Sequence, residues 1–253
     1  MLSTLGFDHP NTVMVVAHRG ASANFPENTM IAFEGAVAAG ADMIELDVQL
    51  SADGIPVVFH DETLDAHTNA LGFVDQYSWD ELKQLDAGSW FDVEYAGQRI
   101  PSLQQVLTYA AGKIALNIEI KGHAKGGIEE KCIQLVRACN MQEQVLFSSF
   151  DYIKIARLKK LDGDIPTALL YQQERFNALP PSALLKKYRA DAFHCSYREL
   201  SGHFLEDLTS HNIPVLIYTV NNKQRMQKLM DTGVNGIFTD KPDLLRVLLA
   251  RQE

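Results

Sequence analysis

Hydrophobic and polar positions along the chain follow two alternating patterns. Short runs rich in β-branched and other apolar residues predict strands, and longer stretches with apolar residues at helical spacing predict the helices between them. The predicted strands are residues 13–17, 43–50, 114–120, 145–149, 167–171, 192–196, 213–220 and 236–239. The predicted helices are residues 28–39, 102–111, 127–139, 152–161, 181–188, 201–210, 223–231 and 242–251. Eight strand-then-helix units with right-handed crossovers favour an α/β fold of the (β/α)8 TIM-barrel type over an open sheet, which would leave two edges to protect.

One connection in this pattern is much longer than the others. Residues 51–101 separate the second strand from its helix, which predicts a small insertion over the barrel mouth within a single catalytic domain of residues 1–253. The turn signal Asp53-Gly54 precedes an apolar run, so we expect a hairpin centred near Asp53. That hairpin would place His60 opposite Leu46 and return a histidine to the second strand.

Charged side chains interrupt two of the predicted strands that are otherwise apolar. Glu45 and Asp47 lie two residues apart and therefore share one face of the second strand. Asn117, Glu119 and Lys121 likewise share one face of the third. A carboxylate in a buried strand must be paired, metal-bound or functional to offset its desolvation. Because the two strands are neighbours in a barrel, we expect the three carboxylates to converge near the carboxyl-terminal rim, where barrel enzymes carry their sites.

Three clustered carboxylates repel one another unless a cation neutralises them. A divalent metal is the simplest such cation, and an all-oxygen donor set favours Mg²⁺ or Ca²⁺, with Mn²⁺ as a further option, over zinc. The alternative is a buried ion network in which Arg19 and Lys121 neutralise Glu45, Asp47 and Glu119. A metal titration separates the two interpretations.

The end of the first strand adds groups suited to phosphate chemistry. His18 closes this strand, and Arg19 offers a rigid fork of donors that matches two phosphate oxygens. His18 and His60 together provide one group to accept a proton and one to donate it. Phosphodiester cleavage needs both, because the nucleophile loses a proton and the leaving alkoxide gains one.

Composition narrows the function classes further. The chain has 253 residues, 46% of them hydrophobic, and a net charge of −9, so we expect no nucleic-acid partner. The first ten residues show no leader pattern, and no later stretch is apolar enough to predict a membrane span. No cysteine pair has ligand spacing; Cys132, Cys139 and Cys195 are expected to be small buried hydrophobes in a cytoplasmic protein.

The ordered set of motifs resembles the glycerophosphodiester phosphodiesterase family over nearly the whole chain. The matching motifs are His18-Arg19-Gly20, Pro26-Glu27-Asn28-Thr29, Glu45-Leu46-Asp47, Asp53-Gly54 leading to His60-Asp61, Asn117-Ile118-Glu119-Ile120-Lys121, Ser148-Ser149-Phe150 and Tyr218-Thr219-Val220-Asn221. The resemblance implies that His18 and His60 are the acid-base pair. It also implies that Arg19 and Lys121 hold the phosphate. The implied metal ligands are Glu45, Asp47 and Glu119.

The resemblance also implies a reaction. A small-molecule glycerophosphodiester would be split into sn-glycerol 3-phosphate and an alcohol, with the attacking group being water or the substrate's own 2-hydroxyl. One alternative is a diesterase of phospholipase C or lysophospholipase D type that acts on lipid-like substrates. A more remote one is a non-catalytic barrel that binds phosphorylated metabolites. The protein is expected to be a monomer or a homodimer.

Two positions depart from the family pattern. Many members carry Trp where this chain has Tyr218, which we expect to form an apolar wall with a polar tip. Gly122-His123 stands where Pro often follows the lysine, and we expect His123 to be a solvated loop residue rather than a substrate contact.

The remaining aromatic and polar residues have structural interpretations. Asn28 is expected to be a helix N-cap, and His194 a core or rim residue. We expect four histidines to be exposed: His9, His67, His203 and His211. The insertion's aromatic residues are expected to form its own small core, with a lid that contacts the alcohol as the alternative; they are Phe59, Trp79, Trp90, Phe91 and Tyr95.

Overall fold

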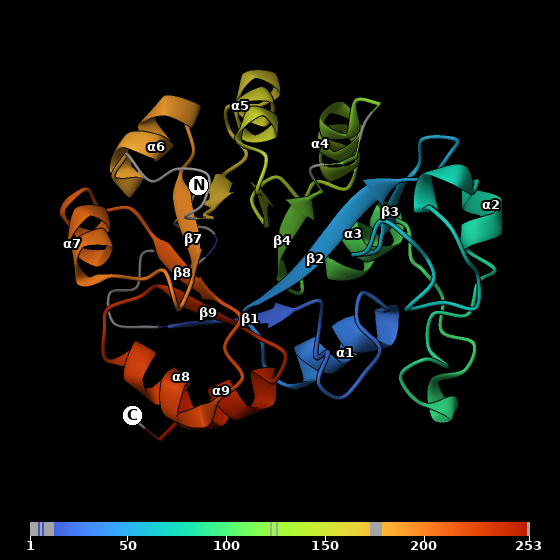
Figure 1. Ribbon diagram of the computed structural model, residues 1–253, viewed down its shortest axis with the longest axis horizontal. Coiled ribbons are helices and arrows are strands. Elements are labelled where there is room, and N and C mark those ends of the chain that lie inside the picture. The colour runs from blue at the N-terminus through green and yellow to red at the C-terminus, as the bar shows by residue number, and fades with distance from the viewer. Residues whose placement is uncertain are drawn as a thin grey trace.

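The computed structural model describes residues 5, 7, 13–121, 123–124, 126–172 and 179–251. Parallel strands form a closed ring at its centre (Figure 1). These strands are β1 (Met14–His18), β2 (Met43–Leu50), β4 (Ala115–Ile120), β5 (Val145–Ser149), β6 (Thr167–Leu170), β7 (Ala192–Ser196), β8 (Val215–Tyr218) and β9 (Gly236–Thr239). Pairing of β1 with both β9 and β2 closes the ring, so the predicted TIM barrel is confirmed.

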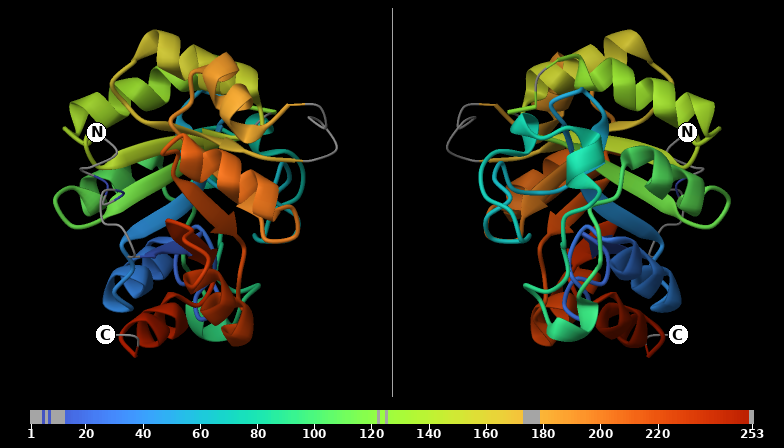
Figure 2. Two further views of the ribbon diagram at one scale, coloured as in Figure 1. Left: turned by 90° about the vertical axis from the view of Figure 1, so that its left-hand side faces the viewer. Right: turned by 90° about the vertical axis from the view of Figure 1, so that its right-hand side faces the viewer.

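Helices surround the ring of strands on the outside (Figures 1 and 2). They are α1 (Met30–Ala38), α3 (Leu103–Ala110), α4 (Ile128–Ala138), α5 (Tyr152–Leu161), α6 (Pro181–Tyr188), α7 (Gly202–Ser210), α8 (Lys223–Met230) and α9 (Pro242–Leu249). The expected N-cap of the first helix is wrong: Thr29 caps α1 and accepts from the backbone N–H of Ala32. Asn28 has a left-handed backbone, with φ of 56°, which frees its side chain for another partner.

Strand alternation separates two apolar regions. Ile44, Leu46 and Val48 of β2 point outward and pack in the large core between the strands and the helices. Met43 points the other way, into a smaller cluster in the barrel interior that includes Val16 and Phe238. Glu45 and Asp47 share the inward face with Met43. The parity read from the sequence is therefore confirmed.

The segment between β2 and α3 begins as a hairpin. Strand β3 (Pro56–Val58) runs antiparallel to β2, with Val48 opposite Val58 and Leu50 opposite Pro56. The same register continues to the backbone N–H of Phe59, which donates to the carbonyl of Asp47 at 3.0 Å. This pairing confirms the predicted hairpin and brings residue 60 back to the middle of β2.

Beyond the hairpin, the insertion contains two 3-10 turns and one short helix. These are η2 (Val74–Gln76), α2 (Trp79–Leu82) and η3 (Val93–Tyr95). Phe59 and Trp79 belong to a separate small apolar cluster, as expected. The expectation for Trp90, Phe91 and Tyr95 is wrong: their rings form an edge-to-face row outside that cluster, and this row continues to Phe25 of the β1–α1 loop.

Other expectations for single residues have mixed outcomes. Cys132 and Cys195 are buried, but Cys139 at the end of α4 is only half-buried; all three are free thiols. His203 and His211 are exposed and His194 is fully buried, whereas His9 lies outside the described residues. No helix within the described ranges is long and apolar enough to cross a membrane.

Candidate active site

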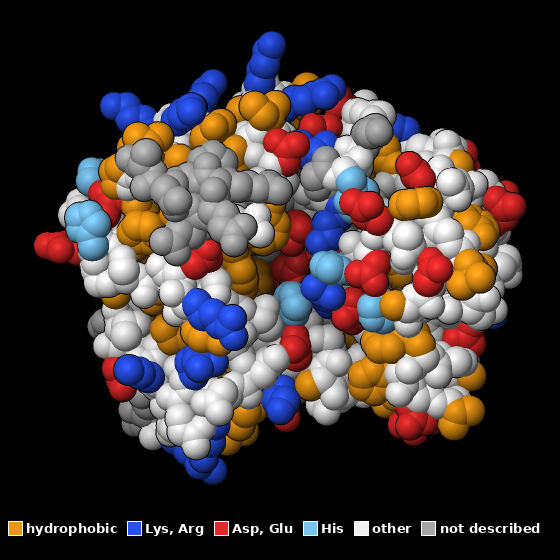
Figure 3. Space-filling model, in the orientation of Figure 1, with side chains coloured by type: hydrophobic (Ala, Val, Ile, Leu, Met, Phe, Trp, Pro, Cys, Tyr) orange, Lys and Arg blue, Asp and Glu red, His pale blue; other side chains and the backbone are white. Residues whose placement is uncertain are grey.

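A pocket of about 260 Å³ opens at the carboxyl ends of the strands. In the space-filling view, acidic, basic and histidine side chains gather around a hollow at the centre of this face (Figure 3). The lining residues are His18, Arg19, Glu45, His60, Asn117, Glu119, Lys121, Phe150, Leu170, Tyr218, Thr219 and Phe238. Of the seven predicted site residues, six line the pocket and the seventh, Asp47, is bonded to two of them.

The three predicted metal ligands converge. Glu45 and Asp47 lie on β2 and Glu119 on β4, and one carboxylate oxygen from each lies within 4.8 Å of the others. The parallel register places Asp47 directly beside Glu119, which explains their proximity. Glu45 and Asp47 are almost fully buried, so water does little to screen their mutual repulsion.

The charge around this carboxylate triad is unevenly balanced. Lys121 Nζ lies 2.7 Å from Asp47 and 2.8 Å from Glu119. Burial disfavours an ionised Asp47, but the charges of Lys121 and Arg19 outweigh it and lower the pKa of this carboxyl. Burial and the neighbouring Asp47 instead raise the pKa of Glu45 to about 8 and raise that of Glu119. Asp47 is therefore neutralised within the protein, whereas Glu45 is not.

These residues fit a divalent cation. The buried ion network proposed as the alternative exists around Asp47, but it leaves Glu45 with the backbone N–H of Arg19 at 3.0 Å and His18 Nε2 at 4.0 Å. A buried carboxylate with a raised pKa needs a proton or a metal ion to neutralise it. Because the donors are all carboxylate oxygens, a hard cation suits them.

His18 reaches the pocket from the end of β1 and is held by a carboxylate behind it. Its Nδ1 donates to Asp240 Oδ1 at 2.7 Å, which leaves Nε2 facing Glu45. Burial lowers the affinity of the ring for a proton, but the hydrogen bond to Asp240 and the charge of Glu45 outweigh it and raise the pKa of His18. Ser22 and Asn221 donate to Asp240 in turn.

His60 reaches the same pocket from the insertion. Its Nδ1 donates to Asp61 Oδ1 at 2.7 Å, and His67 Nδ1 donates to the other oxygen at the same distance. Burial opposes ionisation of Asp61, but these bonds lower the pKa of its carboxyl. The expectation of an exposed His67 is thus wrong, since Asp61 and the ring of Trp90, 4.4 Å away, hold it.

The backbone around His60 is tied to the barrel by one side chain. Gln49 of β2 is buried, and its Nε2 donates to the carbonyls of Phe59 at 2.9 Å and Asp61 at 2.7 Å. These two carbonyls flank His60 in the chain. The position of His60 therefore depends on a residue of the barrel as well as on the insertion.

Arg19 lies where the chain turns over the rim. Its Nη1 donates to Glu27 at 2.9 Å, and its Nε lies 3.4 Å from Asp47 Oδ2. Asn28 Nδ2 donates to the same Asp47 oxygen at 2.8 Å. The Asn28 side chain thus supports Asp47 instead of capping α1. Gly20 has φ of 88°, and an added Cβ would lie 2.7 Å from the backbone of Ala32. Glycine is required here because the loop passes so close to α1.

An aromatic wall completes the pocket. The rings of Phe150 and Tyr218 meet edge to face at 6.1 Å, and Phe238 lies 6.3 Å from Tyr218. The Tyr218 hydroxyl donates to the carbonyl of Tyr171 at 2.6 Å. Tyr218 thus forms a wall, as expected, but its polar tip is already bonded within the protein.

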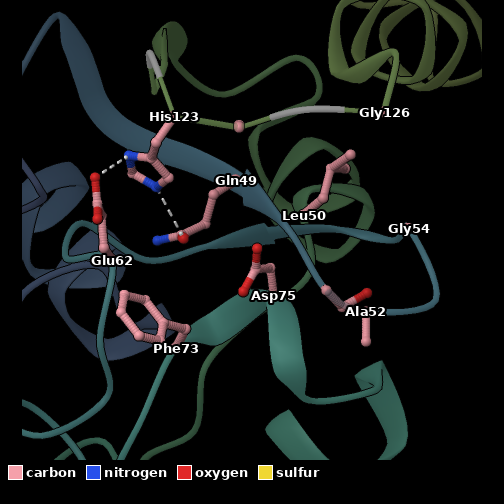
Figure 4. A pocket seen from close by; sticks show the side chains of 11 residues that line it. Gln49, Leu50, Ala52, Gly54, Glu62, Phe73, Asp75, His123 and Gly126 are labelled. Atoms are coloured by element: carbon pink, nitrogen blue, oxygen red, sulfur yellow. Dashed lines mark hydrogen bonds and ion pairs between the residues drawn. The ribbon is translucent and has the colours of Figure 1, made fainter.

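A second cavity of about 470 Å³ is lined by residues of β2, the insertion and the chain after β4 (Figure 4). His123 lines it and points toward Glu62, 3.2 Å from its Nδ1, and toward Gln49 Oε1, 3.2 Å from its Nε2. Phe73 and Asp75 of the insertion face the same space. His123 is therefore an exposed loop residue outside the first pocket, as expected, although both of its ring nitrogens have partners.

Sequence reasoning missed the residues that hold the two histidines. Asp240 directly follows β9, so the rule that charged residues at strand ends reach the rim would have found it. Asp61 and Asn221 stood within the matching motifs without a role. No sequence pattern indicated His67, because its contact with Asp61 depends on how the insertion folds.

The arrangement gathers two histidines, three carboxylates and two cations at the mouth of a TIM barrel, which suits an enzyme that acts on phosphate esters. Residues 18–244 match the Glycerophosphoryl diester phosphodiesterase family. The chain is 40% identical to a glycerophosphodiester phosphodiesterase of Caldanaerobacter subterraneus over 235 residues, 92% of this chain and 96% of that one. It is 28% identical to a human lysophospholipase D over 269 residues, 92% of this chain and 85% of that one.

A solved structure agrees with these relatives. An Oleispira antarctica phosphodiesterase in complex with the product sn-glycerol-3-phosphate superimposes with a TM-score of 0.83 at 31% identity, covering 94% of this chain and 96% of that one. The chain therefore belongs to the glycerophosphoryl diester phosphodiesterase family. It is an enzyme of the phosphoric diester hydrolase class.

Proposed function

We propose that this enzyme hydrolyses glycerophosphodiesters to sn-glycerol 3-phosphate and an alcohol. The observation that carries the proposal is the convergence of the carboxylate triad and two carboxylate-bound histidines on one pocket. Relatives named for this reaction support the choice of substrate. The Oleispira antarctica enzyme, crystallised with sn-glycerol-3-phosphate, supports the choice of product.

Glu45, Asp47 and Glu119 would hold a divalent cation, Mg²⁺ or Ca²⁺, with Mn²⁺ as a further option. When bound, such an ion offsets negative charge on the phosphoryl oxygens. Arg19 and Lys121 line the same pocket and would bind the phosphate from its other sides. Both side chains are held in place by ion pairs with Asp47, so they present charge in a fixed geometry.

His18 and His60 would move the protons. Each ring donates from Nδ1 to an aspartate, which leaves Nε2 of the neutral ring as an acceptor. One histidine would take the proton from the attacking hydroxyl, and the other, in its protonated form, would give a proton to the leaving oxygen. The aspartates fix the tautomer and stabilise the protonated rings.

A second candidate is a diesterase of lysophospholipase D type. The human relative and the exposed apolar residues Leu71 and Phe73 of the insertion favour it, because an acyl chain needs apolar surface near the mouth. The remaining expectations, a cytoplasmic location and a monomer or homodimer, stay predictions.

A product assay tests the proposal. The purified protein is incubated with glycerophosphocholine, glycerophosphoethanolamine and a lysophospholipid, each with Mg²⁺, Ca²⁺ or EDTA. We expect glycerol 3-phosphate from the first two substrates. Lysophosphatidic acid as the main product would establish the second candidate, and no turnover of any diester would refute both.

The chelator arm tests the metal site separately. We expect EDTA to abolish turnover and one added divalent ion to restore it, because the pKa of the buried Glu45 carboxyl stays raised despite the charges of His18 and Arg19, and a divalent ion would neutralise it. Glu119→Gln should weaken ion binding in calorimetry while leaving the melting temperature nearly unchanged. Full activity in EDTA would contradict the metal assignment.

A further inference from the structure

The pocket contains a polar side chain that has no hydrogen-bond partner among the described residues. Asn117 of β4 is 1% exposed, and within the described part of the chain neither its Oδ1 nor its Nδ2 has a hydrogen-bond partner. A buried amide without partners is costly, since it has lost water and gained nothing in return. Asn117 nevertheless lines the pocket, so its free groups are available to whatever occupies it.

Asn117 lies level with Glu45, the deepest member of the carboxylate triad. It lies beside Glu45 in the register of β2 and β4, and one inward position deeper in the barrel than Glu119. The other lining residues toward the interior include Leu170 and Phe238, which offer no hydrogen bonds. A polar group that reaches this depth therefore meets the amide of Asn117 against apolar walls.

Charge and hydrogen-bond capacity limit what that group can be. A second anion is disfavoured next to Glu45, and Oδ1 of Asn117 needs a donor that a phosphate oxygen cannot supply. A hydroxyl can donate to Oδ1 and accept from Nδ2, so it matches both ends of the amide. A glycerophosphodiester carries two free hydroxyls on its glycerol unit, next to the phosphate that the triad would face.

We propose that Asn117 is a specificity-determining residue that hydrogen-bonds a hydroxyl of the substrate's glycerol unit. The inference rests on the proposed function. A site built around such a bond rejects substrates that lack the hydroxyl, because the buried amide is then left unpaired. Asn117 thus separates glycerol diesters from other phosphodiesters that the same triad and histidines could cleave.

The test compares two substrates in one variant. Asn117→Leu keeps the side-chain size and removes both hydrogen-bonding groups. We expect kcat/KM for glycerophosphocholine to fall roughly 10- to 100-fold, and kcat/KM for bis(p-nitrophenyl) phosphate, which has no hydroxyl, to stay within about threefold of wild type. In calorimetry, sn-glycerol 3-phosphate should bind the variant more weakly, whereas inorganic phosphate should bind both proteins alike.

Ser148→Ala is the matched control. Ser148 of β5 is also fully buried with an unpartnered hydroxyl among the described residues, but it does not line the pocket. We expect the substrate preference of this variant to be unchanged. A melting curve checks folding, and Asn117→Ala replaces Asn117→Leu if the latter does not fold.

Each other outcome overturns the inference in a recognisable way. An equal loss of kcat/KM for both substrates would show that Asn117 supports the reaction whatever the substrate. Weaker Mg²⁺ binding in the absence of substrate would show that Asn117 is a metal ligand. No loss for either would mean that Asn117 holds water. If the wild-type protein cleaves the aryl diester but not glycerophosphocholine, the proposed function itself fails.

Discussion

The two histidines at the pocket come from different parts of the molecule. His18 ends a barrel strand, and Asp240 behind it directly follows the neighbouring strand, so the sheet itself holds the pair. His60 lies in the insertion, where Asp61 and His67 orient it and Gln49 ties its backbone to β2. The barrel thus supplies one of the two proposed proton-transfer groups with a rigid geometry, and the insertion supplies the other through a longer chain of contacts.

Replacing each histidine gives the largest expected effect. We expect His18→Ala and His60→Ala each to lower kcat roughly 10²- to 10⁴-fold, because each removes one proton-transfer group. Steady-state assays with circular dichroism as the folding control measure this. Near-normal kcat in either variant would show that this histidine does not transfer a proton in the reaction.

Replacing the supporting aspartates should separate the two sides. Asp240→Asn places an amide against Nδ1 of His18 and favours the wrong tautomer, so we expect a loss in kcat of about 10²-fold or more. Asp61→Asn should cost less, because the Asp61 carboxylate is shared with a second histidine, His67. Equal losses in kcat would show that His18 depends on Asp240 no more than His60 depends on Asp61. In Asp240→Asn the pKa of His18 in the pH profile of kcat/KM should fall, because the hydrogen bond that raises it is lost.

Loosening the attachment of the insertion to the barrel should lower kcat by a smaller factor, and only through the position of His60. Gln49→Leu removes the two bonds to the carbonyls that flank His60. We expect a loss in kcat of about 10-fold or less, since a misplaced catalytic group reacts less often from a near-attack position. If the loss comes from His60, the double variant Gln49→Leu/His60→Ala should be no slower than His60→Ala alone. Additive losses would contradict this.

A third histidine shows how burial in the barrel interior changes the pKa of an imidazole to which no described residue is hydrogen-bonded. His194 of β7 has neither ring nitrogen bonded within the described residues, and burial lowers its pKa to about 3. Its unfolded form takes up a proton below pH 6.5 while the folded form stays neutral, so folding stability should fall as pH drops from 6.5 toward 3. The loss from this group is about 1.4 kcal/mol per pH unit.

Denaturant unfolding at several pH values checks this prediction. His194→Leu should remove the dependence attributed to the group and leave activity near wild type. His203→Ala, at an exposed position of α7, is the matched control and should leave the pH slope unchanged. The same slope in His194→Leu and wild type would contradict the assignment. His18 differs because Asp240 and Glu45 outweigh burial and raise its pKa.

Most of the barrel and of the site could be predicted from the sequence. Strand parity placed Glu45, Asp47 and Glu119 on one inner face, and the hairpin at Asp53-Gly54 brought His60 to them, since both rules depend only on local backbone geometry. The position of the Trp90 ring and the bond from His67 to Asp61 depend on how irregular segments pack. No periodic pattern encodes such contacts.

The bonds of Gln49 bear on how the insertion can be altered. One side chain of the barrel fixes the backbone on both sides of His60, before the chain continues into the turns and short helix of the insertion. The chain from residue 68 to the start of α3 could therefore be exchanged with that of another family member, provided that the replacement keeps Trp90, whose ring packs on His67. Reshaping the rim in this way would change what the enzyme accepts without rebuilding its acid-base pair.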